Sequence, residues 1–184
     1  KLVARTKERD LGGAAKAAYL RAQDALVFLE NQPEQNVFCG FIAANEICVP
    51  LGKKPIYPDV HDEAEKKEFI ANGLSLFELR AHSHEAGGDL KIVKRGKGAP
   101  VISPAIVHWK FKHYSAITKS KGTNHLLVDD GMKYNAWVGE ALFNEQASGY
   151  LLVPGNTPLP AGYTTVSDEE AKKVYGRHCV HGKD

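Results

Sequence analysis

The segment Gln35-Asn36-Val37-Phe38-Cys39-Gly40 leads from a polar loop into an apolar helical pattern that is stopped by Val49-Pro50. A residue before proline disfavours the helical conformation, so the sequence predicts a helix from about Gly40 to Ile47. Cys39 then stands at the helix start, where the partial positive charge of the helix end favours the thiolate, the nucleophilic form of cysteine. The competing interpretation is a small buried hydrophobe, a common role of free cysteine in protein cores.

A nucleophilic thiol needs a base, and two histidines in the second half of the chain are the main candidates. His113 opens the strand-like run 113–117 directly after the polar turn 110–112, so its ring is expected at a strand end. His108 is the rival, with a packed strand histidine beside Trp109 as its alternative role. The pattern favours His113 as the general base.

A third group is needed to orient the imidazole, and a carboxylate that accepts from the second ring nitrogen does this. Asp129 closes the apolar run Leu126-Leu127-Val128-Asp129. In an antiparallel hairpin the start of one strand lies beside the end of the next, so Asp129 is expected near His113. The alternative for Asp129 is turn initiation together with Asp130-Gly131.

A tetrahedral oxyanion needs hydrogen-bond donors. The backbone N–H of Cys39 is one candidate, and a side-chain amide just upstream is the usual second donor. Gln32, Gln35 and Asn36 are the amides that the sequence offers there, with ordinary loop residues as the competing interpretation.

Helical patterns fill the first half of the chain, and strand-like segments follow in the second half. This order indicates the α+β class, and the short connections favour antiparallel pairing. Two serines, each followed three residues later by a glutamate, predict capping boxes: Ser75 with Glu78, and Ser167 with Glu170. The expected helices are 14–31, 40–47, 62–70, one from Ser75 to about 87–88, 138–143 and 167–174, and the expected strands are 90–94, 105–109, 113–118, 125–129 and 150–153.

The amino-acid composition limits the class of protein and the kinds of binding partner that we expect. The chain has 184 residues, is 43% hydrophobic, and carries a formal net charge of +2, with acidic and basic residues interspersed. These values are typical of a globular domain with a hydrophobic core and give no strong field for nucleic acid. No apolar stretch is long enough to span a bilayer. We therefore expect neither a nucleic-acid partner nor a membrane span.

The three cysteines do not form a recognisable framework. Cys39 and Cys48 are too far apart for a CxxC motif, and a disulfide scaffold is not expected. The cluster His178-Cys179-Val180-His181 has metal-binding residue types but lacks a second half-site. We expect no metal and no cofactor.

Five short motifs occur in the order found in double-glycine leader peptidases, the papain-like protease domains of bacteriocin-exporting transporters, which residues 32–154 resemble. The resemblance implies a papain-like cysteine peptidase fold, with N-terminal helices packed on an antiparallel sheet. It implies Cys39 as the nucleophile, His113 as the general base and Asp129 as its orienting residue. The motifs are Gln35-x-x-Phe38-Cys39-Gly40, Pro104-Ala105-Ile106-Val107-His108, His113-Tyr114-Ser115-Ala116-Ile117, Leu127-Val128-Asp129 and Ser148-Gly149-Tyr150-Leu151-Leu152-Val153.

A closer resemblance is to similar domains embedded in large bacterial RHS/YD-repeat proteins, where a linker such as Pro158-Leu159-Pro160-Ala161-Gly162 and a short helix follow. It divides the chain into an N-terminal helical segment at 1–31, the peptidase domain at 32–154, and a linker, helix and tail at 155–184. It implies limited proteolysis or self-processing within a toxin-like protein, with a peptide or the parent chain as substrate and contacts to other domains of that protein. The compartment stays open, with a secreted or cell-surface location as the expectation from this context.

The chain departs from the family pattern at two places. Pro33 stands where the family has its oxyanion glutamine, with Gln32 and Gln35 on either side, and Asp130 stands where the family has proline. These departures keep two alternatives open: a catalytically inactive module of the same fold that binds a peptide or neighbouring domain, and a purely structural plug in which Cys39 is buried.

Overall fold

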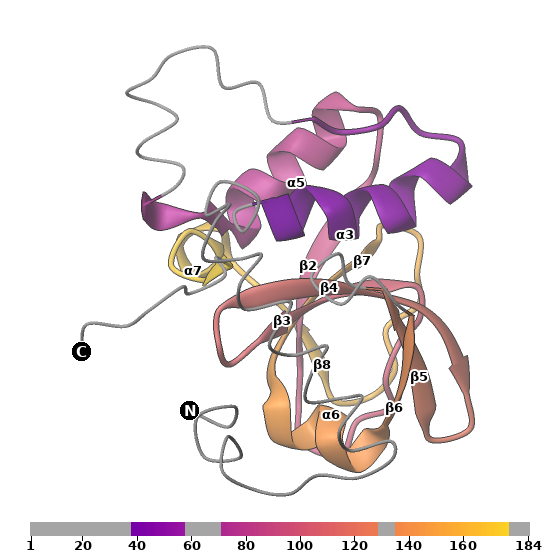
Figure 1. Ribbon diagram of the computed structural model, residues 1–184. Coiled ribbons are helices and arrows are strands. Elements are labelled where there is room, and N and C mark those ends of the chain that lie inside the picture. Colours follow the sequence, from indigo (N-terminus) through magenta and orange to yellow (C-terminus); the bar gives the residue numbers. More distant parts are fainter. Residues whose placement is uncertain (1–37, 58–70, 129–134, 177–184) are drawn as a thin grey trace, which may run out of the picture.

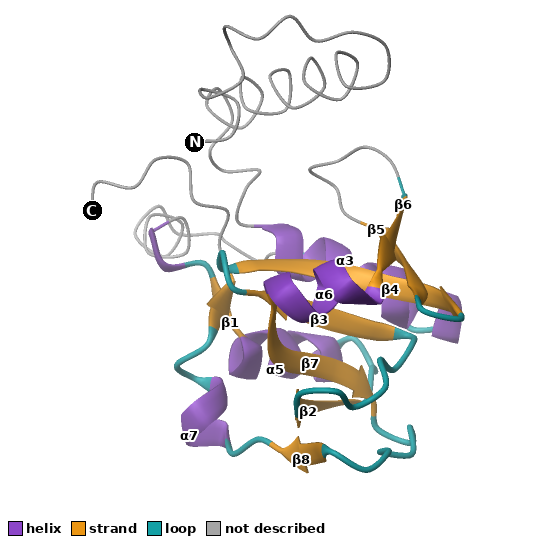
Figure 2. Ribbon diagram, turned by 90° about the horizontal axis from the view of Figure 1, so that it is seen from below, coloured by secondary structure: helices purple, strands orange, loops and turns teal. Residues whose placement is uncertain are grey.

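The structure, a computed structural model, describes residues 38–57, 71–128 and 135–176. The helices predicted at 14–31 and 62–70 lie outside these ranges. Within them, helices cover one face of a curved antiparallel sheet, and a further helix lies at its other face (Figures 1 and 2). This arrangement confirms the predicted α+β class.

Two helices form the layer on the first face of the sheet. Helix α3 spans Cys39–Cys48 and is followed by the 3₁₀ helix η2, Val49–Leu51, so the predicted stop at Val49-Pro50 is confirmed. Helix α5 spans Leu76–Glu85 and begins at the predicted capping box. The Glu78 amide donates to Ser75 Oγ at 3.2 Å, and the Ser75 amide donates to Glu78 Oε2 at 2.8 Å. Both orphan amides at this helix start are thereby satisfied.

The sheet has seven strands in the order β6-β5-β4-β3-β7-β2-β8, and every neighbouring pair is antiparallel. Five of its strands match predicted segments. The structure adds β6, which we predicted as the start of a helix at 138–143; helix α6 begins only at Glu140, because residues 136–139 pair with β5. The bounds are β2 Leu90–Arg95, β3 Ala105–Trp109, β4 His113–Lys121, β5 Asn124–Val128, β6 Ala136–Gly139, α6 Glu140–Gln146, β7 Ala147–Pro154 and β8 Tyr163–Thr165.

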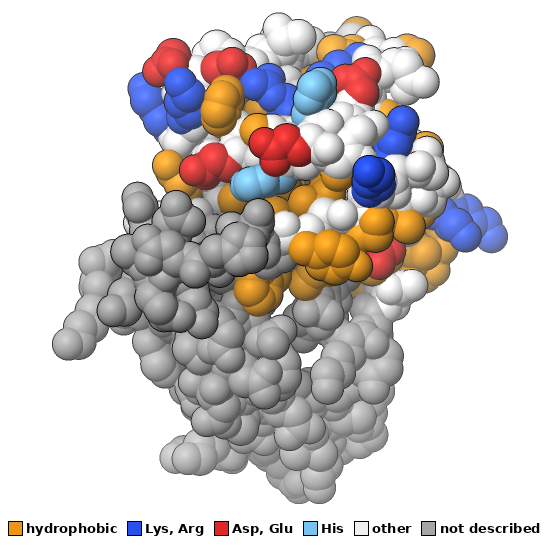
Figure 3. Space-filling view, turned by 90° about the horizontal axis from the view of Figure 1, so that it is seen from above, with side chains coloured by type: hydrophobic (Ala, Val, Ile, Leu, Met, Phe, Trp, Pro, Cys, Tyr) orange, Lys and Arg blue, Asp and Glu red, His pale blue; other side chains and the backbone are white. Residues whose placement is uncertain are grey.

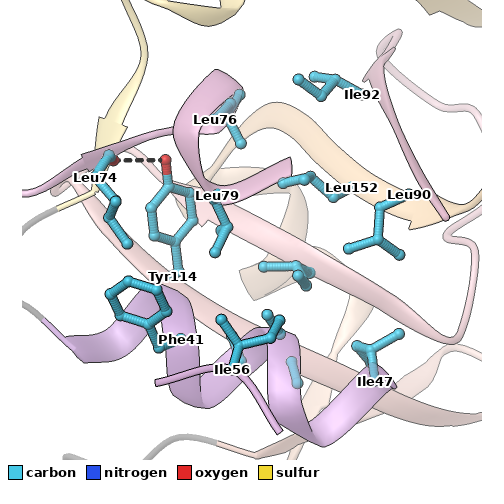
Figure 4. Close-up of a cluster of buried hydrophobic side chains, with 14 of the residues drawn as sticks. Phe41, Ile47, Ile56, Leu74, Leu76, Leu79, Leu90, Ile92, Tyr114 and Leu152 are labelled. Atoms are coloured by element: carbon cyan, nitrogen blue, oxygen red, sulfur yellow. Dashed lines mark hydrogen bonds between the residues drawn. The ribbon is translucent and has the colours of Figure 1, made fainter. Parts of the chain in front are cut away.

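Two hydrophobic clusters occupy the two faces of the sheet, because successive strand residues point to opposite faces. On β4, Tyr114 and Ala116 join the cluster under α3 and α5, which Figure 4 shows around the Tyr114 ring. Ile117 joins the second cluster, where Phe143 of α6 packs against Trp109. Strand β4 therefore contributes side chains to both cores.

The C-terminal segment packs on the rest of the fold through three short elements. Strand β8 pairs with β2, helix α7 spans Asp168–Ala171, and β9, Tyr175–Gly176, pairs with β1, Leu74–Ser75. The helix predicted at 167–174 is thus shorter than expected. The capping box predicted for it, Ser167 with Glu170, is only half formed. Ser167 Oγ accepts from the Glu170 amide, whereas the Glu170 carboxylate binds side chains of the sheet instead.

The face that Figure 3 shows carries Lys, Arg, Asp and Glu side chains side by side, without a region of one sign. Within the described residues, no helix combines the length and apolar character needed to cross a membrane.

Candidate active site

Cys39 is the first residue of α3, as the sequence predicts, and its side chain is 7% exposed. The first amides of a helix have no acceptor within the helix, and they carry the positive end of the helix dipole. No acidic residue lies in the first turn of α3 to neutralise this charge. Cys39 therefore stands at the positive end of this helix.

Tyr114 fixes the start of α3 against β4. A Cβ atom added at Gly40 would lie 3.3 Å from Tyr114 Cδ2 and 3.3 Å from Leu74 Cδ1, so the helix approaches this ring closely because residue 40 lacks a side chain. The Tyr114 hydroxyl donates to the Leu74 carbonyl at 3.1 Å. Burial raises the pKa of Tyr114 well above its usual value, and the neighbouring Cys39 adds to the effect. Tyr114 is thus a protonated donor beside the thiol.

His113, the residue before Tyr114, is the first residue of β4 and is 6% exposed. A three-residue turn connects it to β3, with Trp109 directly opposite His113. Lys112 closes this turn with φ 60°, and its amide donates to the Trp109 carbonyl at 2.9 Å. A left-handed residue at the end of a three-residue turn is a standard hairpin geometry, and here it sets the direction in which β4 begins.

Aromatic rings hold the His113 imidazole. Phe111 stacks on it at a centroid distance of 5.9 Å and an interplanar angle of 18°, and Trp109 stacks on Phe111 at 6.0 Å. By strand alternation His113 leaves β4 on the face opposite to Tyr114. Burial is the main cause of the lowered pKa of His108, a residue on the Tyr114 face, and the nearby His113 lowers this pKa further.

His108 is a packed strand histidine, so the alternative role considered for it is the one observed. Its Nε2 lies 2.9 Å from the Tyr175 carbonyl, which can only accept, and its Nδ1 lies 2.8 Å from Ser148 Oγ. Burial lowers the pKa of His108, which favours the neutral ring, and the Tyr175 carbonyl accepts the proton of Nε2. With both nitrogens engaged, His108 is not available as the general base.

The lowered pKa of His108 predicts a loss of stability in mild acid. The unfolded chain binds a proton near the ordinary value of 6.5 while the folded chain does not, so the free energy of unfolding falls as pH drops through that value. We expect the urea midpoint to be lower at pH 5.5 than at pH 7.5. In His108→Gln, which keeps an N–H donor, this difference in urea midpoint should be smaller. Part of the difference should remain, because burial also lowers the pKa of His125. An unchanged difference would contradict this assignment.

The two described cysteines differ in setting. Cys48 lies at the far end of α3, where burial raises the pKa of its thiol, and it lines a cavity of about 460 Å³ with Lys53 and Asp89. A raised pKa makes a thiol inert at neutral pH. Cys48 therefore has the structural role that the sequence assigns to it, and Cys39 is the candidate nucleophile.

Three predicted site residues, Asp129, Gln32 and Gln35, lie outside the described residues, as does the His178–His181 cluster. Strand β5 ends at Val128, directly opposite Ala116 of β4, so Asp129 is the next residue of the chain after this pair. Among the residues that the structure describes, no three His, Cys, Asp or Glu side chains gather in a way that could hold a metal ion.

Two site residues escaped prediction from the sequence. Phe111 reads as part of a polar turn between lysines, and Tyr114 reads as an ordinary strand residue. Phe111 also lines an apolar cavity of about 140 Å³ with Trp109, Leu127, Val138 and others, adjacent to His113. The aromatic spacing Trp109-x-Phe111 was the available signal, but it does not reveal which ring covers the histidine.

Comparison with known proteins places this arrangement in a family. The model of the Peptidase C39 family matches residues 35–158. Three solved structures are similar to parts of this chain. A double glycine motif protease from an AMS/PCAT transporter, in complex with the leader peptide, is 15% identical with a TM-score of 0.49, covering 64% of this chain and 83% of that one.

The peptidase domain of Streptococcus mutans ComA is 14% identical with a TM-score of 0.39, covering 45% of this chain and 75% of that one. The N-terminal peptidase C39 like domain of the toxin secretion ATP-binding protein from Vibrio parahaemolyticus is 18% identical with a TM-score of 0.35, covering 50% of this chain and 71% of that one. No curated protein is similar enough to count as a match.

Proposed function

Because this chain belongs to the Peptidase C39 family, we propose that it is a cysteine endopeptidase that cuts peptides after a pair of glycines. The observation that carries the proposal is the position of Cys39 at the start of α3, packed on the strand that begins with His113. The positive end of a helix favours a thiolate, and a histidine on the strand beneath that helix is the base that nucleophilic cysteine chemistry requires.

In this mechanism the Cys39 thiolate attacks the carbonyl carbon of the scissile peptide bond, and the carbonyl oxygen becomes an oxyanion. The imidazolium of His113 protonates the leaving amine as the C–N bond breaks, which leaves a thioester on Cys39. His113 then takes a proton from water, the hydroxide attacks the thioester, and the carboxylate product leaves with the thiolate restored. The Cys39 amide is the backbone donor proposed for the oxyanion.

Asp129 is the residue proposed to orient His113, and Gln35 or Gln32 the residue proposed to complete the oxyanion hole. In support, the β4–β5 register brings Val128, the residue before Asp129, opposite Ala116 near the start of β4. A carboxylate bound to the second ring nitrogen would fix the tautomer and stabilise the imidazolium.

The biological role we propose is limited proteolysis or self-processing within a larger bacterial RHS/YD-repeat protein, which rests on the resemblance of residues 158–176. A peptide, or the parent chain, is the proposed substrate, and other domains of that protein are the proposed contacts.

The competing function is a catalytically inactive module that binds a peptide or a neighbouring domain. Two observations favour it: Pro33 stands in place of the oxyanion glutamine, and both Cys39 and His113 are buried. Such a module would bind a double-glycine peptide without cutting it.

The decisive experiment incubates the chain with a leader-like peptide that contains Gly-Gly and with the same peptide carrying Ala-Ala. We expect mass spectrometry to find cleavage after the second glycine and none in the Ala-Ala peptide. In parallel, iodoacetamide labelling of Cys39 should be rapid at neutral pH and at least about tenfold slower in His113→Ala, which lacks the imidazole that stabilises the thiolate. Binding of the Gly-Gly peptide without cleavage, with labelling indifferent to His113, would establish the inactive module instead.

A further inference from the structure

The strand β9 lies outside the region matched by the family model, which ends at residue 158. It pairs with β1 through backbone hydrogen bonds, and its backbone accepts one side-chain hydrogen bond from the seven-stranded sheet. On one side it pairs with β1, and the Leu76 amide donates to the Val174 carbonyl at 2.9 Å. On the other side the Tyr175 carbonyl accepts from His108 Nε2 at 2.9 Å. An extended segment bound through its backbone from both edges is held as a peptide ligand is held.

Gly176 occupies a position that only glycine fits. A Cβ atom at this residue would lie 2.1 Å from Tyr114 Cε2 and 2.3 Å from Tyr114 Cδ2, both in a ring that is itself buried. The same Cδ2 atom is the one that a Cβ atom at Gly40 would approach at 3.3 Å. Gly176 therefore packs on the Tyr114 ring immediately beside the residue that follows Cys39.

We propose that β9 occupies, within its own chain, a peptide-binding channel formed by the edge of β1, His108 and Tyr114, and that it competes there with substrate. The proposal rests on the proposed peptidase function. The ligand of this channel is an extended peptide with a glycine at the place of Gly176.

The attachment of this segment is uneven along its length. Strand β9 itself has two residues, and the helix before it packs Ala171 in the hydrophobic core but is tied to its neighbours otherwise by exposed side chains. Glu170 accepts from Tyr150 Oη at 2.6 Å and from Lys94 Nζ at 2.9 Å, and Arg80 binds Asp168 at 2.9 Å. Exposed ion pairs contribute little stability, and segments with few buried contacts open first.

The test compares two neighbouring glutamates of α7. Glu170→Ala removes the tie to the sheet, whereas Glu169→Ala removes only a bond to Lys172 within the same short segment. Both variants lose the same charge and keep the channel intact. For Glu170→Ala we expect iodoacetamide labelling of Cys39 and cleavage of the Gly-Gly peptide to rise about three- to tenfold, the change expected from losing a weak tether. Glu169→Ala should match the wild type.

A second variant acts on the channel itself. Gly176→Ala introduces a methyl group that the Tyr114 ring does not accommodate, so β9 should leave and both rates should rise by about tenfold or more. Gly139→Ala, at a glycine with open surroundings, is the matched control. A synthetic peptide with the sequence of residues 168–176 should slow the Gly176→Ala variant again, and the same peptide ending in alanine should not.

The outcomes separate the two proposals. Equal labelling and cleavage rates in wild type and Glu170→Ala would overturn the occupation by β9 and leave the peptidase proposal standing. Faster labelling of Cys39 in Glu170→Ala, with no cleavage by any variant, would support the occupation and reject the peptidase.

Discussion

Replacing Cys39 by alanine is expected to lower kcat/KM for a Gly-Gly peptide by at least about a thousandfold, because the variant loses the proposed nucleophile, on which both chemical steps depend. His113→Ala should cause a loss of similar size, since residues that act as one catalytic unit are strongly non-additive. The double variant should therefore be little worse than either single one. Peptide cleavage followed by mass spectrometry gives all three rates.

Cys48 provides the matched control for this experiment, because it lies on the same helix and is buried like Cys39. Cys48→Ala should keep the rate of the wild type within about twofold and cost about 1 kcal/mol of stability, a typical value for a small buried truncation. If Cys39→Ala still cut the peptide, or if both alanine variants lost activity to the same extent, Cys39 would not be the nucleophile.

Phe143→Ala is expected to have the largest effect on stability. Phe143 is 0% exposed, and its ring contacts Trp109 at 5.6 Å, His125 at 5.6 Å and the Arg95 guanidinium at 5.5 Å. Truncation of a buried phenylalanine costs about 3–5 kcal/mol, because it removes apolar contacts and leaves a cavity. We expect the melting temperature to fall by roughly 10 °C, measured by calorimetry or circular dichroism.

Leu142 is the neighbouring control on α6, with 52% of its side chain exposed. Leu142→Ala should change stability by less than about 0.5 kcal/mol, because little apolar surface is lost from the core. Similar melting temperatures for the Phe143→Ala and Leu142→Ala variants would show that α6 does not cover the second hydrophobic cluster.

The parts of the fold that follow from local sequence were predictable. The start of α3 at Cys39, the capping box at Ser75 and Glu78, and the β-branched and aromatic strands β3 and β4 are all specified by residues within a few positions. These elements place Cys39 and Tyr114 together and put His113 at the start of β4.

The parts that depend on distant partners were not predictable. Strand β6 is four residues long and β9 only two, and both are too short for a strand pattern to be recognised in the sequence. Strand β9 forms because its backbone pairs with that of Leu74 and Ser75, which lie about a hundred residues earlier in the chain. The same holds for Tyr114, whose contacts with Leu74, Gly40 and Gly176 come from three separate segments.

The turn before His113 links the direction of the imidazole to the stability of the whole domain. A lysine at φ 60° costs roughly 1 kcal/mol relative to ordinary backbone, so Lys112 keeps this conformation only while surrounding structure enforces it. That structure is the β3–β4 pairing, which lies in the middle of the sheet and opens only when the fold opens. Alignment of His113, the proposed base, is therefore a property of the folded core: it should persist unchanged up to the melting transition and vanish with it.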